Sequence, residues 1–235
     1  MSLLLRSDLF IQEQNLYAGL GNKIASYFPS TVFESFPDTR NIKKSNAIFT
    51  GPILNIDLAD KNPKKINEQF TIGIQGGSQG SEQVNQFVYK FINELNNSNV
   101  NFLHITGPNK SNNEAFDKVF YQQVEFIQDM DKYYKSIDFQ ISRAGGGILE
   151  AAYLNIPQLL VPFKHGTTAN HQTLNAEYLV ETGNAITVED YAQFSKIINN
   201  ICEHQNSYLK ENYKPQNIKV GNDDIFKIIT SGSHE

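Results

Sequence analysis

The chain of 235 residues is poor in several features, and each scarcity excludes a class of protein. Its single cysteine, Cys202, cannot form a disulfide within the chain, which is typical of a reducing, cytosolic compartment. We expect Cys202 to be a small buried residue on a helix. No apolar run approaches the roughly 18 residues that a membrane-spanning helix needs, and residues 1–8 resemble neither a signal peptide nor an anchor.

The sequence also lacks a concentrated block of positive charge. The net charge is −5 and no basic block occurs, which argues against a broad nucleic-acid-binding surface. His165 and His171 have neither a cysteine nor a set of carboxylates near them in the sequence, so we predict no metal site and no cofactor. Hydrophobic residues make up 40% of the chain and charged residues 19%, which predicts a packed core.

A polar, charged stretch over 55–69 reads as a linker and divides the chain. The residues after it alternate between strand and helix patterns, which indicates a doubly wound α/β domain with parallel strands over 70–220. Ligands bind such domains at the carboxyl ends of the strands. The expected strands are 70–75, 100–105, 124–127, 138–141, 158–161 and 185–187, and the expected helices are 82–95, 114–121, 130–134, 147–154, 170–181, 191–203 and 224–229.

Residues 1–54 contain fewer elements. They predict strands over 9–12, 31–34 and 47–50 and a helix over 19–28, which is only part of a second α/β domain. The last segment, 221–235, is expected to be a terminal helix and tail.

Two glycine-rich loops follow strands and precede helices. In Gly76-Gly77-Ser78-Gln79-Gly80 the glycines allow close backbone approach, and the following helix offers free N–H groups to an anion. An ordinary glycine-rich turn is the alternative. The second loop, Ser142-Arg143-Ala144-Gly145-Gly146-Gly147, makes a similar cradle with Glu150 in the helix after it. Glu150 could bind a ribose diol or be a first-turn acid favoured by the helix dipole, and Arg143 could bind a ligand or form an ion pair.

Two further segments carry amide and imidazole groups. The segment 161–176 places His171 beside Gln172 at a helix start, a pairing suited to sugar hydroxyls. The segment 11–15 places Glu13 beside amides, including that of Asn15, after a strand. A solvated loop is the alternative reading of that second segment.

These segments, in this order, resemble the MurG family, the lipid-linked N-acetylglucosaminyltransferases of peptidoglycan synthesis, which have the GT-B fold. That family has a His-Glu-Gln-Asn segment, a Gly-Gly-Ser-Gln-Gly loop, a segment that contains Asp-Met, a Ser-Arg-Ala-Gly loop followed by Glu, and a Val-Pro…His-Gln-Thr-x-Asn-Ala segment. The match runs from about Ile11 to about Ala185. The resemblance implies an inverting, metal-independent transfer of N-acetylglucosamine from UDP-N-acetylglucosamine to the undecaprenyl-diphosphate-linked muramyl-pentapeptide, at the inner face of the cell membrane.

The resemblance also implies roles for particular residues. The donor would be held by both glycine loops, with Glu150 at the ribose and the backbone near Ile127 at the uracil. Gly147 and Ile148 would present N–H groups to the diphosphate, and His171 and Gln172 would contact the sugar or the phosphates. The full set of expected substrate-binding residues is Asn15, Gly77, Ser78, Gln79, Ile127, Arg143, Gly146, Gly147, Ile148, Glu150, His171 and Gln172, and Glu13 is the candidate base on the acceptor side.

The chain also departs from the family pattern. Gln12 stands where the family has His, Leu54 where it has Arg, and Ile148 where it has Thr. The interval from Arg143 to Glu150 is one residue shorter, which makes Ala151 an alternative ribose contact. The family's amino-terminal glycine-rich loop has no counterpart, so we expect this chain alone to transfer little sugar. The alternatives are the donor-binding subunit of a split GT-B enzyme, which needs a partner chain or the missing amino-terminal segment, an inactive truncated product, and an epimerase, which the His-Gln-Thr-Leu-Asn-Ala segment disfavours.

Overall fold

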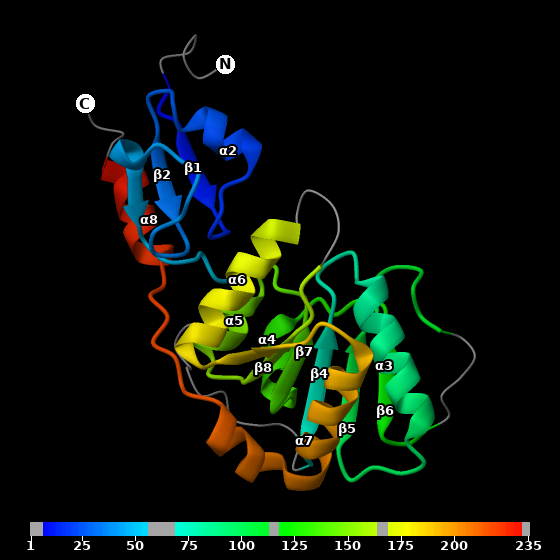
Figure 1. Cartoon of the computed structure of the whole chain (residues 1–235). Helices are drawn as coiled ribbons and strands as arrows, with labels where there is room; N and C mark the ends of the chain where they lie inside the picture. Colours follow the sequence, from blue (N-terminus) through cyan, green and yellow to red (C-terminus); the bar gives the residue numbers. More distant parts are fainter. Residues whose placement is uncertain (1–6, 56–68, 113–117, 164–168, 232–235) are drawn as a thin grey trace. The chain divides into compact units, whose positions relative to one another are not determined.

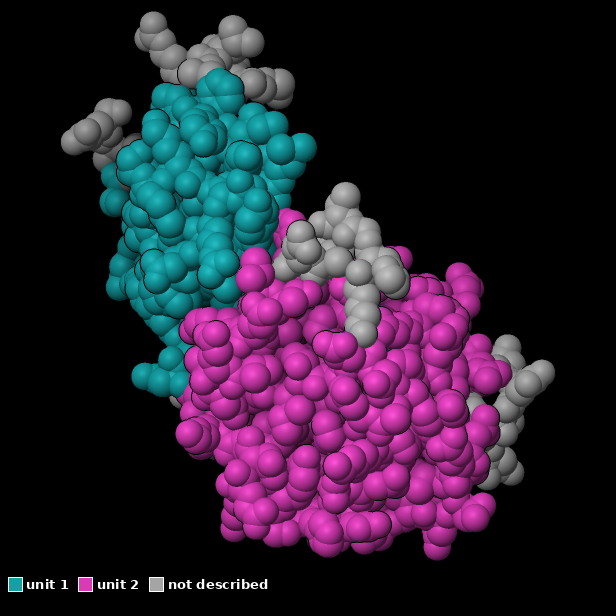
Figure 2. Space-filling view, in the orientation of Figure 1, with its two compact units in different colours: residues 1–55, 217–235 teal, residues 56–216 magenta. Residues whose placement is uncertain are grey.

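The computed structural model describes residues 7–55, 69–112, 118–163 and 169–231 (Figure 1). The chain forms two compact units, which Figure 2 shows in different colours. The first unit contains residues 1–55 and 217–235, and the second contains residues 56–216. Each unit is described by itself below.

The second unit is built on a sheet of six parallel strands in the order β6-β5-β4-β7-β8-β9. In this unit the chain enters the sheet at its middle, in β4, and proceeds outward through β5 to β6. It then crosses back to β7, beside β4, and continues outward through β8 to β9. This is the doubly wound order, so the fold expected for this part is confirmed, and the switch point lies between β4 and β7. The strands are β4 (Thr71–Gln75), β5 (Asn101–Ile105), β6 (Tyr121–Val124), β7 (Phe139–Ser142), β8 (Gln158–Leu160) and β9 (Ala185–Thr187).

Helices cover both faces of this sheet, as the alternating side chains of its strands require (Figure 1). Ile72 and Ile74 of β4 join the hydrophobic core on the face covered by α3 (Glu82–Glu94) and α7 (Tyr191–Asn212). Gly73 faces the other way, where a Cβ would lie 2.5 Å from the Tyr133 hydroxyl of α4 (Met130–Ser136). The helix α5 (Ile148–Tyr153) contacts β8, and α6 (Ala169–Thr182) contacts β9.

The amphipathic pattern of α3 explains why this segment is helical and how it packs. Ser81 caps its amino end, because its hydroxyl accepts a hydrogen bond from the Val84 N–H at 3.4 Å. The buried side chains recur at helical spacing, and the rings of Phe87 and Phe91 contact Phe194 of α7 at centroid distances of 5.5 and 6.1 Å. The buried residues of α3 are Val84, Asn85, Val88, Phe91 and Ile92.

The first unit has a sheet of three parallel strands in the order β1-β2-β3. They are β1 (Phe10–Glu13), β2 (Thr31–Glu34) and β3 (Ala47–Phe49), with helix α2 (Leu20–Ala25) and the short 3-10 helix η1 (Lys44–Asn46) in the connections. The partial α/β organisation expected for this segment is therefore observed.

The terminal helix α8 (Asn222–Ser231) also belongs to the first unit (Figure 1). The Asn222 side chain exchanges two hydrogen bonds, both of 3.0 Å, with the backbone of Leu54. Gly51 adopts a φ of +86°, and a Cβ there would meet the Lys219 carbonyl oxygen at 2.1 Å. The expected division therefore differs at its carboxyl end, since residues 217–220 join the first unit rather than the domain predicted over 70–220.

Three sequence-based elements are corrected. The predicted helix over 114–121 lies partly outside the described residues, and its described end is a turn followed by β6. The predicted strand over 124–127 begins three residues earlier, at Tyr121, because Tyr121 pairs with Phe102 of β5. The helix predicted over 191–203 continues to Asn212, across a kink at Gln205 with a φ of 37°.

Candidate functional site

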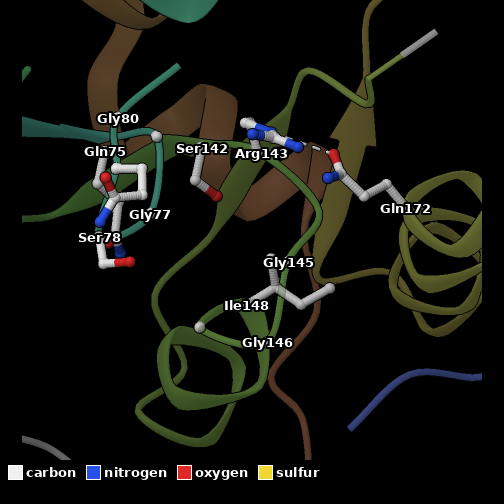
Figure 3. A pocket seen from close by; sticks show the side chains of 13 residues that line it. Gln75, Gly77, Ser78, Gly80, Ser142, Arg143, Gly145, Gly146, Ile148 and Gln172 are labelled. Carbon is white, nitrogen blue, oxygen red and sulfur yellow. Dashed lines mark hydrogen bonds between the residues drawn. The ribbon is translucent and has the colours of Figure 1, made fainter. Parts of the chain in front are cut away.

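A pocket of about 290 Å³ opens at the carboxyl ends of β4 and β7, at the switch point of the sheet (Figure 3). Open α/β sheets bind ligands at this position. Both glycine-rich loops line the pocket, as the sequence predicted for the loops after these two strands. Its lining residues are Gln75, Gly76, Gly77, Ser78, Gln79, Gly80, Ser142, Arg143, Gly145, Gly146, Gly147, Ile148 and Gln172.

The glycines of the first loop are needed for different structural reasons. A Cβ on Gly76 would lie 2.1 Å from the Ser81 backbone nitrogen, and one on Gly80 would lie 2.0 Å from the Thr106 carbonyl oxygen. Both are therefore required by close packing. Gly77 has a φ of +83° but open space around it, and within the described residues no hydrogen bond engages the backbone N–H groups of residues 77–79. These exposed groups are available to a ligand in the pocket.

Hydrogen bonds hold part of the second glycine-rich loop in place and leave other backbone N–H groups of the loop unengaged by the described residues. The side-chain amide of Asn175 in α6 donates to the Ala144 carbonyl oxygen at 3.2 Å. The Ile148 N–H donates to the Gly145 carbonyl oxygen at 3.3 Å, which closes a turn. The N–H groups of Gly146 and Gly147 have no such partner in the described part of the chain. The Ile148 N–H is therefore engaged within the loop, and the contact of Gly147 and Ile148 with a diphosphate stays a prediction.

Arg143 supplies the positive charge of the pocket. Its Nε donates to the Gln172 Oε1 at 3.3 Å (Figure 3), and its guanidinium lies 5.1 Å from the centre of the Phe163 ring. Partial burial lowers the pKa of Arg143, yet its terminal nitrogens form no ion pair with a carboxylate among the described residues. The ion-pair alternative for Arg143 is therefore not observed, and its guanidinium can receive an anion.

Gln172 connects this arginine to the next strand. Phe163 follows β8, and its N–H donates a second hydrogen bond to the Gln172 Oε1 at 3.2 Å. The side chain is buried, so the oxygen is committed to the protein. We therefore expect the amide nitrogen to be the ligand-facing atom of Gln172.

Glu150 lies outside the lining of the pocket. It is half-buried, and its Oε2 accepts a hydrogen bond from the hydroxyl of the buried Tyr134 at 3.0 Å. Burial raises the pKa of Tyr134 well above its usual range, and the nearby Glu150 carboxylate raises it further. Ile127 and His171 are half-buried and also lie outside the lining, while His165 lies outside the described residues. The ribose, uracil and sugar contacts assigned to Glu150, Ile127 and His171 stay predictions, and Ala151 is fully buried.

Glu13 and Asn15 belong to the first unit. The Glu13 carboxylate is 2% exposed, and both of its oxygens accept hydrogen bonds. Oε1 accepts from the backbone and side-chain nitrogens of Asn15 at 2.9 and 3.1 Å, and Oε2 accepts from the Gly19 N–H at 3.1 Å and the Asn22 amide at 2.9 Å. This arrangement favours a structural role over that of a base, because no oxygen is open to a substrate. It likewise commits the Asn15 amide to the protein.

Sequence reasoning missed two residues of the site. Gln75 lines the pocket, and Asn175 anchors the second glycine loop. A signal existed for Gln75, since a polar residue ends an otherwise apolar strand directly before the glycines. Asn175 stands in the recognised 161–176 segment, but its bond to a carbonyl 31 residues away could not be seen in the sequence.

The described residues contain neither a metal-binding cluster nor a helix that could cross a membrane. No group of three or more His, Cys, Asp or Glu side chains in these segments is placed to hold a metal ion. No helix in the described ranges combines the length and the apolar character that crossing a bilayer requires.

The strand order and the two glycine-rich loops at the switch point define a doubly wound α/β domain of the kind found in GT-B proteins. The model of one protein family, described as the glycosyltransferase family 28 C-terminal domain, matches residues 71–227. The chain therefore belongs to glycosyltransferase family 28, as the motifs indicated.

Curated relatives carry the name UDP-N-acetylglucosamine–N-acetylmuramyl-(pentapeptide) pyrophosphoryl-undecaprenol N-acetylglucosamine transferase. The one from Psychromonas ingrahamii is 32% identical over 77% of this chain and 52% of its own length. The one from Clostridium tetani is 29% identical over 92% of this chain and 64% of its own length. The chain thus spans between about half and two thirds of these relatives. The crystal structure of Acinetobacter baumannii MurG has the same fold, with a TM-score of 0.68 at 23% identity over 98% of this chain and 68% of that one.

Proposed function

We propose that the second unit binds UDP-N-acetylglucosamine in the pocket between the two glycine loops. The observation that carries this proposal is the convergence on one cavity, at the switch point of the sheet, of the Arg143 guanidinium and of backbone N–H groups that have no partner among the described residues. A diphosphate suits such a set of donors, because backbone N–H groups and an arginine bind phosphate oxygens without a cation. The names of the relatives support the choice of this donor.

The protein that contains this unit would transfer N-acetylglucosamine to the lipid-linked muramyl-pentapeptide, with inversion at the anomeric carbon. The acceptor hydroxyl attacks that carbon, its proton passes to a base, and UDP leaves. Arg143 and the loop N–H groups stabilise the charge that develops on the leaving diphosphate, and no metal is required. The bonding of Glu13 supports placing the base elsewhere on the acceptor side.

The first unit would face the acceptor at the inner surface of the cell membrane. Apolar side chains on and next to α2 support contact with a membrane, since Leu20 is 71% and Ile24 54% exposed beside Lys23. The remainder of the acceptor-side domain would come from an amino-terminal segment of the same protein or from a partner chain. The second of these sources corresponds to the donor-binding subunit of a split enzyme.

The test is a calorimetric titration with UDP-N-acetylglucosamine, paired with an assay of sugar transfer to the lipid-linked acceptor. The wild type should bind the donor equally with and without a chelator. Arg143→Met should weaken binding about tenfold or more, since hydrogen bonds to charged groups contribute about 1.5–3 kcal/mol. The exposed Arg40→Met is the matched control and should bind as the wild type does. No heat at millimolar donor would overturn the proposal.

The transfer assay distinguishes the alternatives. If this chain binds the donor but transfers sugar only after a partner chain or an amino-terminal segment is added, it is a donor-binding half. Binding without transfer under every condition would instead identify an inactive product. Transfer at a normal enzymatic rate, about one per second or more, by this chain alone would contradict our expectation that more chain is needed.

A further inference from the structure

A line of buried side-chain amides crosses one face of the sheet in the second unit and ends at the pocket. The Gln75 Nε2 donates to the Gln140 Oε1 at 2.9 Å, and the Gln140 Nε2 donates to the Gln158 Oε1 at 3.0 Å. The Gln158 Nε2 donates to the Asn184 Oδ1 at 2.7 Å. Gln140, Gln158 and Asn184 are at most 1% exposed, whereas Gln75 lines the pocket. We call these four residues the amide chain.

Backbone carbonyl groups fix the direction of the amide chain. The Gln158 amide also contacts the Ile148 carbonyl oxygen at 3.0 Å, and the Asn184 amide contacts the Ile156 carbonyl oxygen at 3.4 Å. A carbonyl oxygen only accepts hydrogen bonds, so the atom that faces it must be the NH2 group. With Gln158 fixed in this way, its oxygen must accept from Gln140, and the oxygen of Gln140 must accept from Gln75.

The direction of the hydrogen bonds in the amide chain leaves one hydrogen-bond acceptor at the end that reaches the pocket. The NH2 group of Gln75 is engaged by the Gln140 Oε1. Its Oε1 has no hydrogen-bond partner among the described residues, and Gln75 is the half-buried end of the amide chain at the pocket. Hydrogen bonds that run in one direction polarise one another, which makes the terminal oxygen a better acceptor.

We propose that the Gln75 carbonyl oxygen accepts a hydrogen bond from a sugar hydroxyl of the bound nucleotide, and that Gln140 is the residue that positions it. The inference rests on the proposed donor binding and adds a specificity-determining contact to it. The pocket otherwise offers mainly N–H groups. These donate hydrogen bonds to phosphate oxygens but cannot accept a hydrogen bond from a hydroxyl. A fixed acceptor beside them favours ligands that carry a hydroxyl next to the diphosphate. The hydroxyl could come from the ribose or from the N-acetylglucosamine.

The test uses Gln75→Met, which keeps the length of the side chain and removes the acceptor. One hydrogen bond to an uncharged group corresponds to about a five- to tenfold change in affinity, so we expect a loss of that size for UDP-N-acetylglucosamine. If the hydroxyl belongs to the ribose, UDP binding weakens equally, and if it belongs to the hexose, UDP binding is unchanged. Gln123→Met, a part-buried glutamine of β6 whose amide bonds Asn112, is the matched control and should bind both ligands normally.

A double-mutant cycle tests the positioning role of Gln140. If Gln140 acts by holding Gln75, the Gln140→Met and Gln75→Met/Gln140→Met proteins should both lose as much affinity as Gln75→Met, because the same contact is lost each time. Losses that multiply would contradict positioning. Wild-type affinity for both ligands in Gln75→Met, or an equal loss in Gln123→Met, would overturn the proposed contact.

A measurement on the wild type tests the same contact even if the variants do not fold. In protein labelled with 15N-glutamine, saturation with UDP-N-acetylglucosamine should move the Gln75 carboxamide signals and leave those of Gln123 in place. Unmoved Gln75 signals in a protein that binds the nucleotide would overturn the inference. Absence of nucleotide binding by the wild type would instead contradict the proposed function.

Discussion

The Asn175 side chain and the Ala144 carbonyl group join α6 to the second glycine loop by a hydrogen bond of 3.2 Å, and Asn175 is fully buried. Asn175→Ala would leave this buried carbonyl without its donor, which costs about 1–3 kcal/mol of unfolding free energy. The loop would also lose its support, so we expect weaker nucleotide binding. Denaturant unfolding and calorimetry measure the two effects. Asn199→Ala, at an exposed amide of α7, should change neither, and a normal nucleotide affinity in Asn175→Ala would show that the anchor is dispensable.

Gly80→Ala should destabilise the second unit strongly. The residue has a φ of +68°, and the new Cβ would fall 2.0 Å from the Thr106 carbonyl oxygen, which is part of the backbone. Strained backbone and a clash of this kind together cost at least about 2 kcal/mol. Gly145→Ala is the control, because nothing lies within 4 Å of its Cβ position and it has no positive φ. Equal unfolding midpoints for the two variants would contradict the account of this loop.

The fold was predictable from sequence where local pattern and topology agree. The apolar strand before Gly76 and the helical spacing after Ser81 specified β4, the first glycine loop and α3 without long-range information. The segment before Val124 misled the prediction, because Gln122 and Gln123 do not alternate with apolar residues. Its strand exists through pairing with β5, and such tertiary pairing overrides weak local preference.

The site was predictable to a similar extent. The two glycine loops and Arg143 could be found because their residue types are unusual after strands. The amide chain could not, because it depends on strand register: Gln140 pairs with Gln158 across β7 and β8, while Gln75 lies diagonal to Gln140 on the same face. The packing of α8 against Leu54 joins residues 168 positions apart, and no local pattern encodes it.

Glu13→Gln should destabilise the first unit and leave nucleotide binding unchanged. The carboxylate accepts from four donors, and an amide nitrogen in place of either oxygen would face donors instead. The expected cost is about 1–3 kcal/mol, measured by thermal unfolding, with the exposed Glu211→Gln as control. A variant that melts as the wild type does but has lost sugar transfer in the assembled enzyme would restore Glu13 as a candidate base.

The buried His104 should make stability fall in acid. Burial lowers the pKa of His104 to about 3, and its ring nitrogens bond the Tyr121 hydroxyl and the Asn85 amide oxygen at 2.8 and 3.0 Å. Because the folded pKa is below the ordinary value of 6.5, the unfolded chain takes up the proton first as pH falls. The stability contribution is therefore complete above about pH 6.5 and is lost between there and pH 3, by up to about 1.4 kcal/mol per pH unit.

Denaturant unfolding across this pH range measures the slope. His104→Gln removes the titrating group and should flatten it, although the variant is less stable at neutral pH. The exposed His204→Gln should keep the wild-type slope. An unchanged slope in His104→Gln would mean that other groups cause the acid sensitivity.

A backbone amide NMR titration shows directly whether a nucleotide sugar binds between the two glycine loops of the second unit. On addition of UDP-N-acetylglucosamine, we expect the largest shifts at the N–H groups of residues 76–80 and 145–148. The amides of β1, β2 and β3 in the first unit should stay in place. Shifts that are concentrated in the first unit, or that are spread evenly and omit the glycine loops, would show that the nucleotide sugar does not bind there.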